Sequence, residues 1–316
     1  MLLLDLGLVA VGLAVLLLAG DLLVRGAVNL ALRAGVPALM VGMTVVAFGT
    51  SAPELLVSVQ AVLAGAGGLA LGNVVGSNTA NILLVLGAPA LIAAVAVGRD
   101  VTRDYLIMLA ISALFVALAF TGVIGRWQAA VLLGAFALFM ADSFRRARRA
   151  RNGPQPEELE GADPALPPLH IAIFTALGLI GLPLGAQMLV TGSVSIAEAL
   201  GVSDLIIGLT IVAVGTSLPE LATTLMAAIR REGGVALGNI IGSNLFNLAL
   251  ILGVAGLVGP MPIPAQMLAL DIWVMLAASL VLGLFIWAAR PISRLWGLVL
   301  LLAYAGYIWA IIWIGV

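Results

Sequence analysis

The stretch VAFGTSAPELLVSVQ at residues 46–60, followed by LGNVVGSNTANILLVLG at residues 71–87, decides the fold because the chain contains it twice. The second copy reads VAVGTSLPELATTLM at residues 212–226 and LGNIIGSNLFNLALILG at residues 237–253. Each residue of the first copy has its counterpart 212 − 46 = 166 residues later, with no gap. This constant offset indicates an internal duplication.

The composition places the duplication in a membrane. Hydrophobic residues make up 63% of the chain, charged residues only 9%, and the mean hydropathy is +1.23. A soluble domain carries roughly 25% charged residues, so the sequence predicts an all-α integral membrane protein. The apolar runs are continuous rather than alternating, which excludes a barrel. The net charge of −1 indicates no nucleic-acid partner, and the absence of cysteine excludes disulfides and thiolate metal sites.

About ten apolar segments are long enough to cross a bilayer, which takes roughly 20 residues of helix. The N-terminal run lacks the basic region of a signal peptide and continues into the first copy, so we expect it to be a spanning helix. The expected spans are residues 2–30, 36–64, 69–93, 104–122, 126–144, 169–199, 204–229, 235–258, 266–289 and 294–315.

The basic residues are all arginines, and they fall unevenly on the two sides of the membrane. Positive residues mark cytoplasmic loops, so we expect both termini of this plasma-membrane (inner-membrane) protein to lie outside the cytoplasm. Only Arg126 lies on the outer side. The thirteen others lie on the cytoplasmic side: Arg25, Arg33, Arg99, Arg103, Arg145, Arg146, Arg148, Arg149, Arg151, Arg230, Arg231, Arg290 and Arg294.

Five spans per half is an odd number, so the second half crosses the membrane upside down relative to the first. Such inverted-topology repeats are found in many secondary transporters. We expect residues 1–144 and 169–316 to form the two five-helix repeats, with residues 145–168 as a cytoplasmic linker. This linker is basic, then acidic, then proline-rich, which is typical of a solvated, mostly disordered segment. Its arginines are interpreted as a topology anchor.

Each copy carries a glutamate near the middle of an apolar span, at Glu54 and Glu220. An acid at that depth costs roughly 2.5–3.5 kcal/mol even on lenient insertion scales, so two matched acids indicate a compensating role. Other polar residues recur at helical spacing and share a helix face with one another. The faces carry Ala47, Thr50, Ser51 and Glu54, then Asn73, Ser77 and Asn81, and in the second copy Ala213, Thr216, Ser217 and Glu220, then Asn239, Ser243 and Asn247.

Proline precedes each glutamate, at Pro53 and Pro219. A proline inside a helix removes one hydrogen bond and frees the carbonyl four residues earlier, here that of Gly49 or Gly215. Irregular backbone is tolerated in a membrane where it is buried or lines a cavity. Carboxylate, hydroxyl, amide and carbonyl oxygens together suit Ca²⁺ or Na⁺ rather than softer metals. The single histidine, His170, is expected at the membrane interface and not in the site.

Close helix packing is expected at GNVVG and GNIIG, because glycines four apart let helices approach each other. No Lys-Ser/Thr pair follows these glycines, which argues against a phosphate-binding loop. The glycines are Gly72 and Gly76 in the first copy and Gly238 and Gly242 in the second. Asp21 and Arg25, four residues apart in the first span, are expected to form an ion pair.

The paired motifs GTS-x-PE and GN-x-x-GSN closely resemble the two alpha-repeats of the cation/calcium antiporter superfamily, in particular its compact prokaryotic sodium/calcium exchangers. The resemblance implies ion sites at the bilayer midplane between the second, third, seventh and eighth spans. It also implies that the first and sixth spans slide across this core to alternate access. The implied ligands are Glu54, Glu220, Thr50, Ser51, Thr216, Ser217, Ser77, Ser243, Asn81 and Asn247, with the carbonyls of Ala47 and Ala213.

The sequence therefore predicts a Na⁺/Ca²⁺ antiporter that is not an enzyme, needs no cofactor beyond the transported ions, and has lipids but no obligate protein as partners. The alternative within transporters is an exchanger of Ca²⁺ or another divalent cation for H⁺. A channel would show a continuous polar stripe, and an intramembrane enzyme would need a nucleophile with its base or a metal triad. Some exchangers carry an aspartate where this chain has Asn247, so the Na⁺ stoichiometry stays open.

Overall fold

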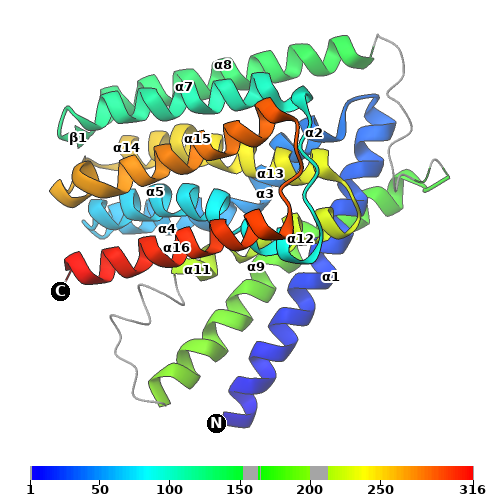
Figure 1. Ribbon diagram of the computed structural model, residues 1–316, viewed down its shortest axis with the longest axis horizontal. Coiled ribbons are helices and arrows are strands. Elements are labelled where there is room, and N and C mark those ends of the chain that lie inside the picture. Colours follow the sequence, from blue (N-terminus) through cyan, green and yellow to red (C-terminus); the bar gives the residue numbers. More distant parts are fainter. Residues whose placement is uncertain (1, 152–162, 164, 200–212, 316) are drawn as a thin grey trace.

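The computed structural model describes residues 2–151, 163, 165–199 and 213–315. The described chain is almost entirely helical (Figure 1). Its α-helices are α1 (Leu2–Ala34), α2 (Ala38–Val41), α3 (Ala47–Thr50), α4 (Ala52–Leu63), α5 (Gly67–Leu83), α6 (Gly87–Ile92), α7 (Thr102–Ala119), α8 (Arg126–Arg151), α9 (Pro168–Ala199), α11 (Ala213–Thr216), α12 (Leu218–Ile229), α13 (Gly233–Leu245), α14 (Leu252–Val258), α15 (Ile272–Ala288) and α16 (Arg294–Gly315).

Shorter elements complete the list. Three π-helical turns are η1 (Gly42–Val46), η4 (Phe246–Ile251) and η5 (Met267–Asp271), and η2 (Arg99–Val101) is a 3₁₀ turn. Strands β1 (Val123–Ile124) and β2 (Met261–Pro262) pair antiparallel, Val123 opposite Pro262. These two strands join the two halves at one end of the bundle, and a bridge between Val95 and Ile292 is a further link between them.

The expectation of about ten spans agrees with the described chain. Eight of its helices are long and apolar enough to cross a membrane, and the bent pair Ala38–Thr50 plus Ala52–Leu63 adds a ninth. The remaining expected span, residues 204–229, is described only from residue 213 onward, as α11 and α12. The protein is thus a multi-pass, all-α membrane protein.

The two spans that carry the GNxxGSN motifs form the centre of the bundle. Over an 18-residue apolar stretch of each span, 83% of residues are buried in Gly233–Val258 and 72% in Gly67–Ile92, against 17% in the peripheral α16. Small side chains allow this close packing. A Cβ on Gly238 would lie 2.5 Å from the Leu39 carbonyl oxygen, so α13 and the α2–η1 segment are in backbone contact.

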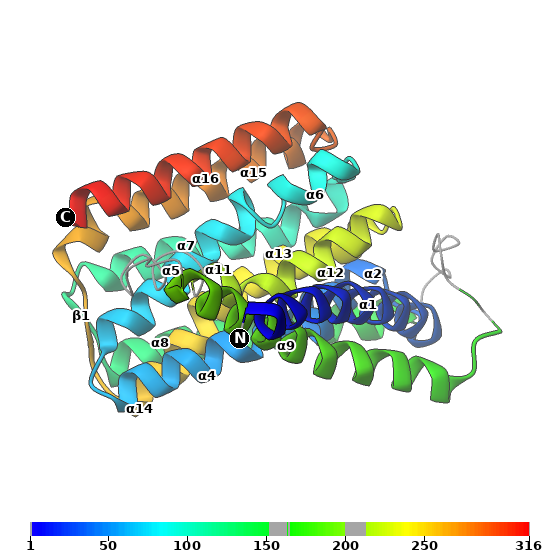
Figure 2. The ribbon, with the colours of Figure 1, turned by 90° about the horizontal axis from the view of Figure 1, so that it is seen from below.

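Helices α1 and α9 form a separate long pair. Gly26 lies against Thr175 near one end of the pair and Gly192 lies against Asp5 near the other, so the two helices run antiparallel. The N-terminal end of α1 and the C-terminal end of α9 extend away from the main bundle (Figure 1), and the view from below shows the two helices side by side (Figure 2). Asp21 of α1 forms the expected ion pair with Arg25, at 3.0 Å, and a second one with Arg230 at the end of α12.

Both GTS-x-PE segments break their helices at the serine. Ser51 has φ −87° and ψ 5°, and Ser217 has φ −89° and ψ 4°, so the two breaks have the same geometry. The following prolines fall in the first turn of α4 and α12, where a missing N–H costs little. In the first half, the helices on either side meet at an angle of 44°. The expected proline kink is therefore a full helix break that places each glutamate in a first turn.

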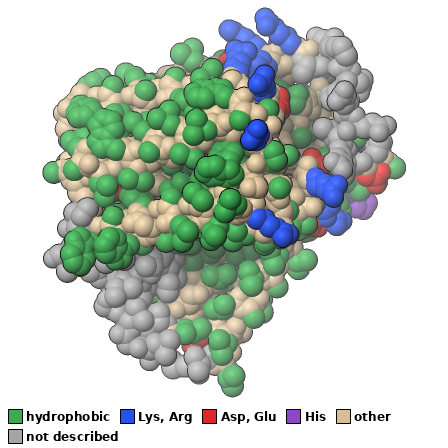
Figure 3. Space-filling model, in the orientation of Figure 1, with side chains coloured by type: hydrophobic (Ala, Val, Ile, Leu, Met, Phe, Trp, Pro, Cys, Tyr) green, Lys and Arg blue, Asp and Glu red, His purple; other side chains and the backbone are tan. Residues whose placement is uncertain are grey.

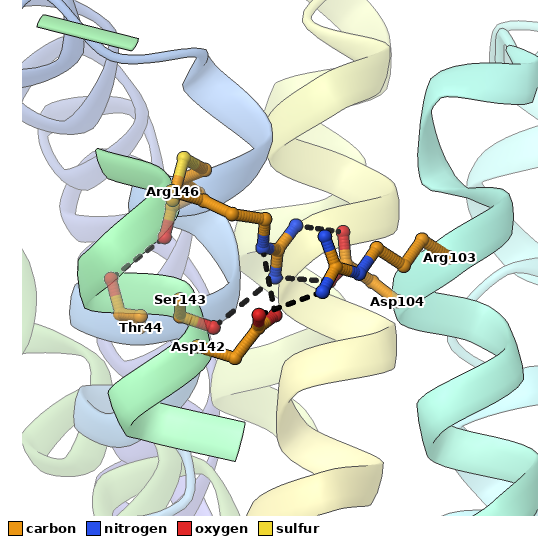
Figure 4. A network of polar contacts seen from close by, with 7 residues as sticks. Thr44, Arg103, Asp104, Asp142, Ser143 and Arg146 are labelled. Carbon is orange, nitrogen blue, oxygen red and sulfur yellow. Dashed lines mark hydrogen bonds and ion pairs between the residues drawn. The ribbon is translucent and has the colours of Figure 1, made fainter. Parts of the chain in front are cut away.

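The first residues of the expected linker, 145–151, are helical and not disordered. Helix α8 does not end at residue 144 but continues to Arg151. Arg146 explains the extension, because its guanidinium bonds both carboxylate oxygens of Asp104 on α7, at 2.5 and 3.0 Å (Figure 4). Asp142 pairs with Arg146 at 3.0 Å and accepts a bond from Arg103 at 2.7 Å. Of the expected disordered linker, residues 152–162 and 164 lie outside the described residues.

The structure confirms half of the expected glycine packing. Gly238 and Gly242 are in close contact with η1 and α3, as predicted. Among the residues that the structure describes, nothing lies within 4 Å of a Cβ added at Gly72 or Gly76. The counterparts of the segment that covers α13 are residues 204–212, which lie outside the described chain, so the close packing of Gly72 and Gly76 stays a prediction.

Candidate cation site

The two intramembrane glutamates lie in the centre of the bundle. Glu54, on α4, is 1% exposed and Glu220, on α12, is 0% exposed. Their carboxylates are close enough to interact electrostatically. Since α4 and α12 begin at equivalent breaks, each half of the duplication contributes one buried glutamate to the same part of the core.

Hydrogen bonds cross from the first half to the second at this point. The Ser51 hydroxyl donates to Glu220 Oε1 at 3.1 Å, and the Thr50 hydroxyl donates to Asn239 Oδ1, also at 3.1 Å. Ser243 on α13 donates to the same Glu220 oxygen at 3.4 Å. The helix break in the first half thus places Ser51 where its hydroxyl bonds the glutamate of the second half.

A second set of bonds is duplicated, and it holds each broken helix against its GNxxG partner. Asn73 donates to the Glu54 carbonyl at 3.3 Å and to the Ser58 hydroxyl at 3.0 Å. Asn239 does the same in the second half, to the Glu220 carbonyl at 3.4 Å and the Thr224 hydroxyl at 3.2 Å. These asparagines therefore position the backbone of the two acids.

Several buried polar atoms of the site have no hydrogen-bond partner within the described residues. An unpartnered buried polar atom is costly, so such a cluster needs an explanation. Most of them are oxygens that can accept or coordinate. The unpartnered atoms are Glu54 Oε2, Glu220 Oε2, Asn81 Oδ1, Asn247 Oδ1 and Nδ2, and Ser217 Oγ.

The other expected ligands lie on the same elements. Thr50 and Ala47, both 0% exposed, are on α3, and the Ala47 carbonyl accepts the Ser51 N–H at 3.0 Å. Ser77 is buried on α5. Helix α11 begins at Ala213 and ends at Thr216. The Ala47 oxygen is thus engaged, and the free carbonyls expected at Gly49 and Gly215 stay a prediction.

The donor set suits a hard cation. Carboxylate, hydroxyl and amide oxygens are the ligands that Ca²⁺ takes, and they disfavour softer metals. Within the described ranges no group of three or more His, Cys, Asp or Glu residues is gathered as for a metal site. The anionic charge of the site is therefore that of its two glutamates, which balances one Ca²⁺ or two Na⁺.

Sequence reasoning missed two residues near the site. Asn78 and Asn244 are each 1% exposed, and Asn244 Oδ1 accepts a hydrogen bond from Asn81 Nδ2 at 3.1 Å. The signal was present, because both copies read GSN. These asparagines follow Ser77 and Ser243 by one residue, so helical spacing places them off the face that those serines share with the expected ligands.

The comparisons with known proteins agree with this geometry. The family described as "Sodium/calcium exchanger protein" matches residues 4–144 and again residues 170–313. The chain belongs to this sodium/calcium exchanger family. Two relatives with high identity are the putative antiporter CaxA of Alkalimonas amylolytica (39% identical; 95% of this chain and 96% of the relative) and the sodium/calcium exchanger MaX1 of Methanosarcina acetivorans (34%; 94% and 95%).

Solved structures of the family show the same fold. The sodium-calcium exchanger NCX_Mj superposes with a TM-score of 0.83 at 34% identity, and the match covers 98% of both chains. At 34% identity the two proteins share sequence as well as fold. The family match and the fold confirm the predicted resemblance and the inverted-repeat, all-helical fold class.

Proposed function

We propose that this protein exchanges Na⁺ for Ca²⁺ across the membrane by alternating access, with the ions bound between Glu54 and Glu220. Family membership supports the antiport of these two ions. The single observation that supports the position of the site is the convergence of two buried glutamates, one from each half, among oxygens without partners. The proposed function is transport of ions that undergo no covalent change.

The proposed ligands are the oxygens that surround the two acids. A buried pair of carboxylates without a cation would be unfavourable, so the site is stabilised by binding either one Ca²⁺ or two Na⁺. Because the two kinds of ion compete for the same two carboxylates, they cross the membrane in alternation, and their fluxes are coupled. The full proposed set is Glu54, Glu220, Thr50, Ser51, Thr216, Ser217, Ser77, Ser243, Asn81, Asn247 and the carbonyls of Ala47 and Ala213.

The proposed moving part is the α1–α9 pair. These two helices contact each other along their length and extend away from the bundle (Figure 1), whereas α5 and α13 are its most buried spans. Glycines at the α1–α9 contact, such as Gly12 and Gly185, bring the two backbones close together, which suits movement of the pair as one unit. A small apolar pocket lined by Phe48, Leu55 and Phe246 reaches Ser51 and is one route toward the site.

The proposed orientation places both termini outside the cytoplasm of the cell and the inner membrane as its location. The basic side chains gather at one end of the molecule, while hydrophobic side chains cover the rest of the visible face (Figure 3). Positive charge marks the cytoplasmic side. Residues 1–144 and 169–316 are the two proposed repeats, with the linker between them on that side.

Reconstituted liposomes test the proposal. An outward Na⁺ gradient should drive ⁴⁵Ca²⁺ uptake, and dissipating that gradient with a Na⁺ ionophore should abolish it. A pH gradient imposed at equal Na⁺ on both sides serves as the matched control. Uptake that follows the pH gradient and ignores Na⁺ would instead establish the H⁺-coupled alternative.

A further inference from the structure

Two asparagines outside the proposed ligand set sit where α5 meets α13. Asn78 and Asn244 are counterparts, since 244 − 78 = 166, and each is 1% exposed. The Asn78 amide donates to the backbone carbonyl of Asn244 at 3.4 Å. The two residues therefore lie at the contact between the halves.

One crossed hydrogen bond connects this pair to a proposed ligand. Asn81 Nδ2 donates to Asn244 Oδ1 at 3.1 Å. The bond turns the amide so that its nitrogen faces Asn244. Asn81 Oδ1 is then left as a buried acceptor without a partner in the described chain. Asn244 thus fixes which end of the Asn81 amide is presented to a cation.

The symmetry-related bond is not formed. It would join Asn247 Nδ2 to Asn78 Oδ1, and both atoms are buried and unpartnered among the described residues. The backbone explains the difference, because Asn81 belongs to the regular helix α5 whereas Asn247 belongs to the π-helical turn η4. A π turn closes its hydrogen bonds over five residues instead of four, which displaces Asn247 from the position that Asn81 has.

We propose that Asn78 and Asn244 are positioning residues that orient the ligand amides crosswise, Asn244 acting on Asn81 and Asn78 acting on Asn247. The second bond forms when access changes sides and η4 adopts the α-helical geometry of its counterpart. Pairing the two orphaned groups removes a desolvation cost, which favours that rearrangement. The inference rests on the proposed function, because only there do Asn81 and Asn247 bind cations.

Double-mutant cycles of Na⁺-driven Ca²⁺ exchange test the crossed pairing in the reconstituted full chain. Asn244→Ala and Asn78→Ala should each raise the KM for Ca²⁺ about fivefold, as the loss of one net hydrogen bond implies. Adding Asn244→Ala to Asn81→Ala should raise KM no further, because the effect passes through Asn81. The pair Asn78→Ala and Asn247→Ala should behave in the same way, since residues in one hydrogen-bond network are non-additive.

A binding measurement, a second set of variants and a control variant complete the test. Equilibrium ⁴⁵Ca²⁺ binding to the purified protein gives the same cycles as Kd values where a variant transports too slowly. Asn244→Leu and Asn78→Leu replace the alanine variants if those do not fold. The matched control is Thr79→Val, because the Thr79 hydroxyl is buried and donates to the Val75 carbonyl of its own helix. This control should keep the KM of the wild type.

The outcomes separate the two proposals. Wild-type protein without Na⁺-driven exchange would contradict the proposed function itself. Active wild type with additive effects in the crossed pairs overturns the positioning roles. Coupling at Asn81–Asn244 alone, with additivity at Asn247–Asn78, also overturns the reciprocal arrangement.

Discussion

Each half has an aspartate near the start of a comparable helix, Asp104 on α7 and Asp271 in η5 just before α15, but the two aspartates have different partners. Asp104 and Asp271 are 271 − 104 = 167 residues apart, one more than the offset of the motifs. Asp104 is 1% exposed and is held by Arg146, whereas Asp271 accepts a hydrogen bond from the Tyr307 hydroxyl at 3.0 Å. In the proposed orientation the first pair lies at the cytoplasmic end and the second near the outer end. One aspartate is thus held by a cation and the other by a neutral hydroxyl.

The middle of the bundle is more nearly symmetric, and its differences are smaller. Asn73 and Asn239 make matching bonds in the two halves. Glu220 accepts bonds from Ser51 and Ser243, while the hydroxyl of Ser217, the counterpart of Ser51, has no partner within the described residues. The halves therefore share a scaffold but differ at the positions where an access change would act.

The largest effect is expected from breaking the Asp104 pair. Arg146→Gln leaves a buried carboxylate without its cation, which costs about 3–5 kcal/mol. Tyr307→Phe removes one neutral donor from Asp271 and should cost about 1 kcal/mol. Unfolding of both variants in detergent measures the difference. Equal losses would show that the two acids are held in the same way.

A glycine at the centre of the bundle tests the close packing of α13. Gly238→Ala forces a methyl group against the Leu39 carbonyl, so we expect a loss of about 1–3 kcal/mol and reduced exchange. Gly134→Ala on the periphery, in α8, is the matched control, since no described atom lies within 4 Å of its added Cβ. Thermal unfolding of the two variants gives the comparison. A Gly134→Ala loss as large as that of Gly238→Ala would contradict the backbone contact.

The smallest effect concerns the two break serines in ion-free protein. Ser51→Ala removes a donor from the buried Glu220 carboxylate and should destabilise the protein by about 1–2 kcal/mol. Ser217→Ala removes a hydroxyl that has no partner in the described chain and should be close to neutral. Unfolding in Ca²⁺- and Na⁺-free detergent compares them. The reverse order of stabilities would contradict the hydrogen-bond assignment.

The fold and the acidic centre of the site could be predicted from the sequence because duplication and hydropathy act over many residues. The positions of Glu54 and Glu220 followed from matched motifs alone. The extension of α8 could not be predicted, because the Arg146–Asp104 pair joins residues 42 apart in sequence. The π-helical turn at Asn247 could not be predicted either, since the motif around it is almost the same as the motif around Asn81, which is α-helical.

The central claim is that one glutamate from each half binds the same cation. It is tested most directly by Na⁺-driven ⁴⁵Ca²⁺ uptake in liposomes containing Glu54→Gln, Glu220→Gln or the exposed control Asp100→Asn. Each glutamine leaves one negative charge for a divalent cation in a buried site, so we predict that both variants lose exchange while Asp100→Asn keeps it. Wild-type uptake in either glutamine variant would contradict the shared site.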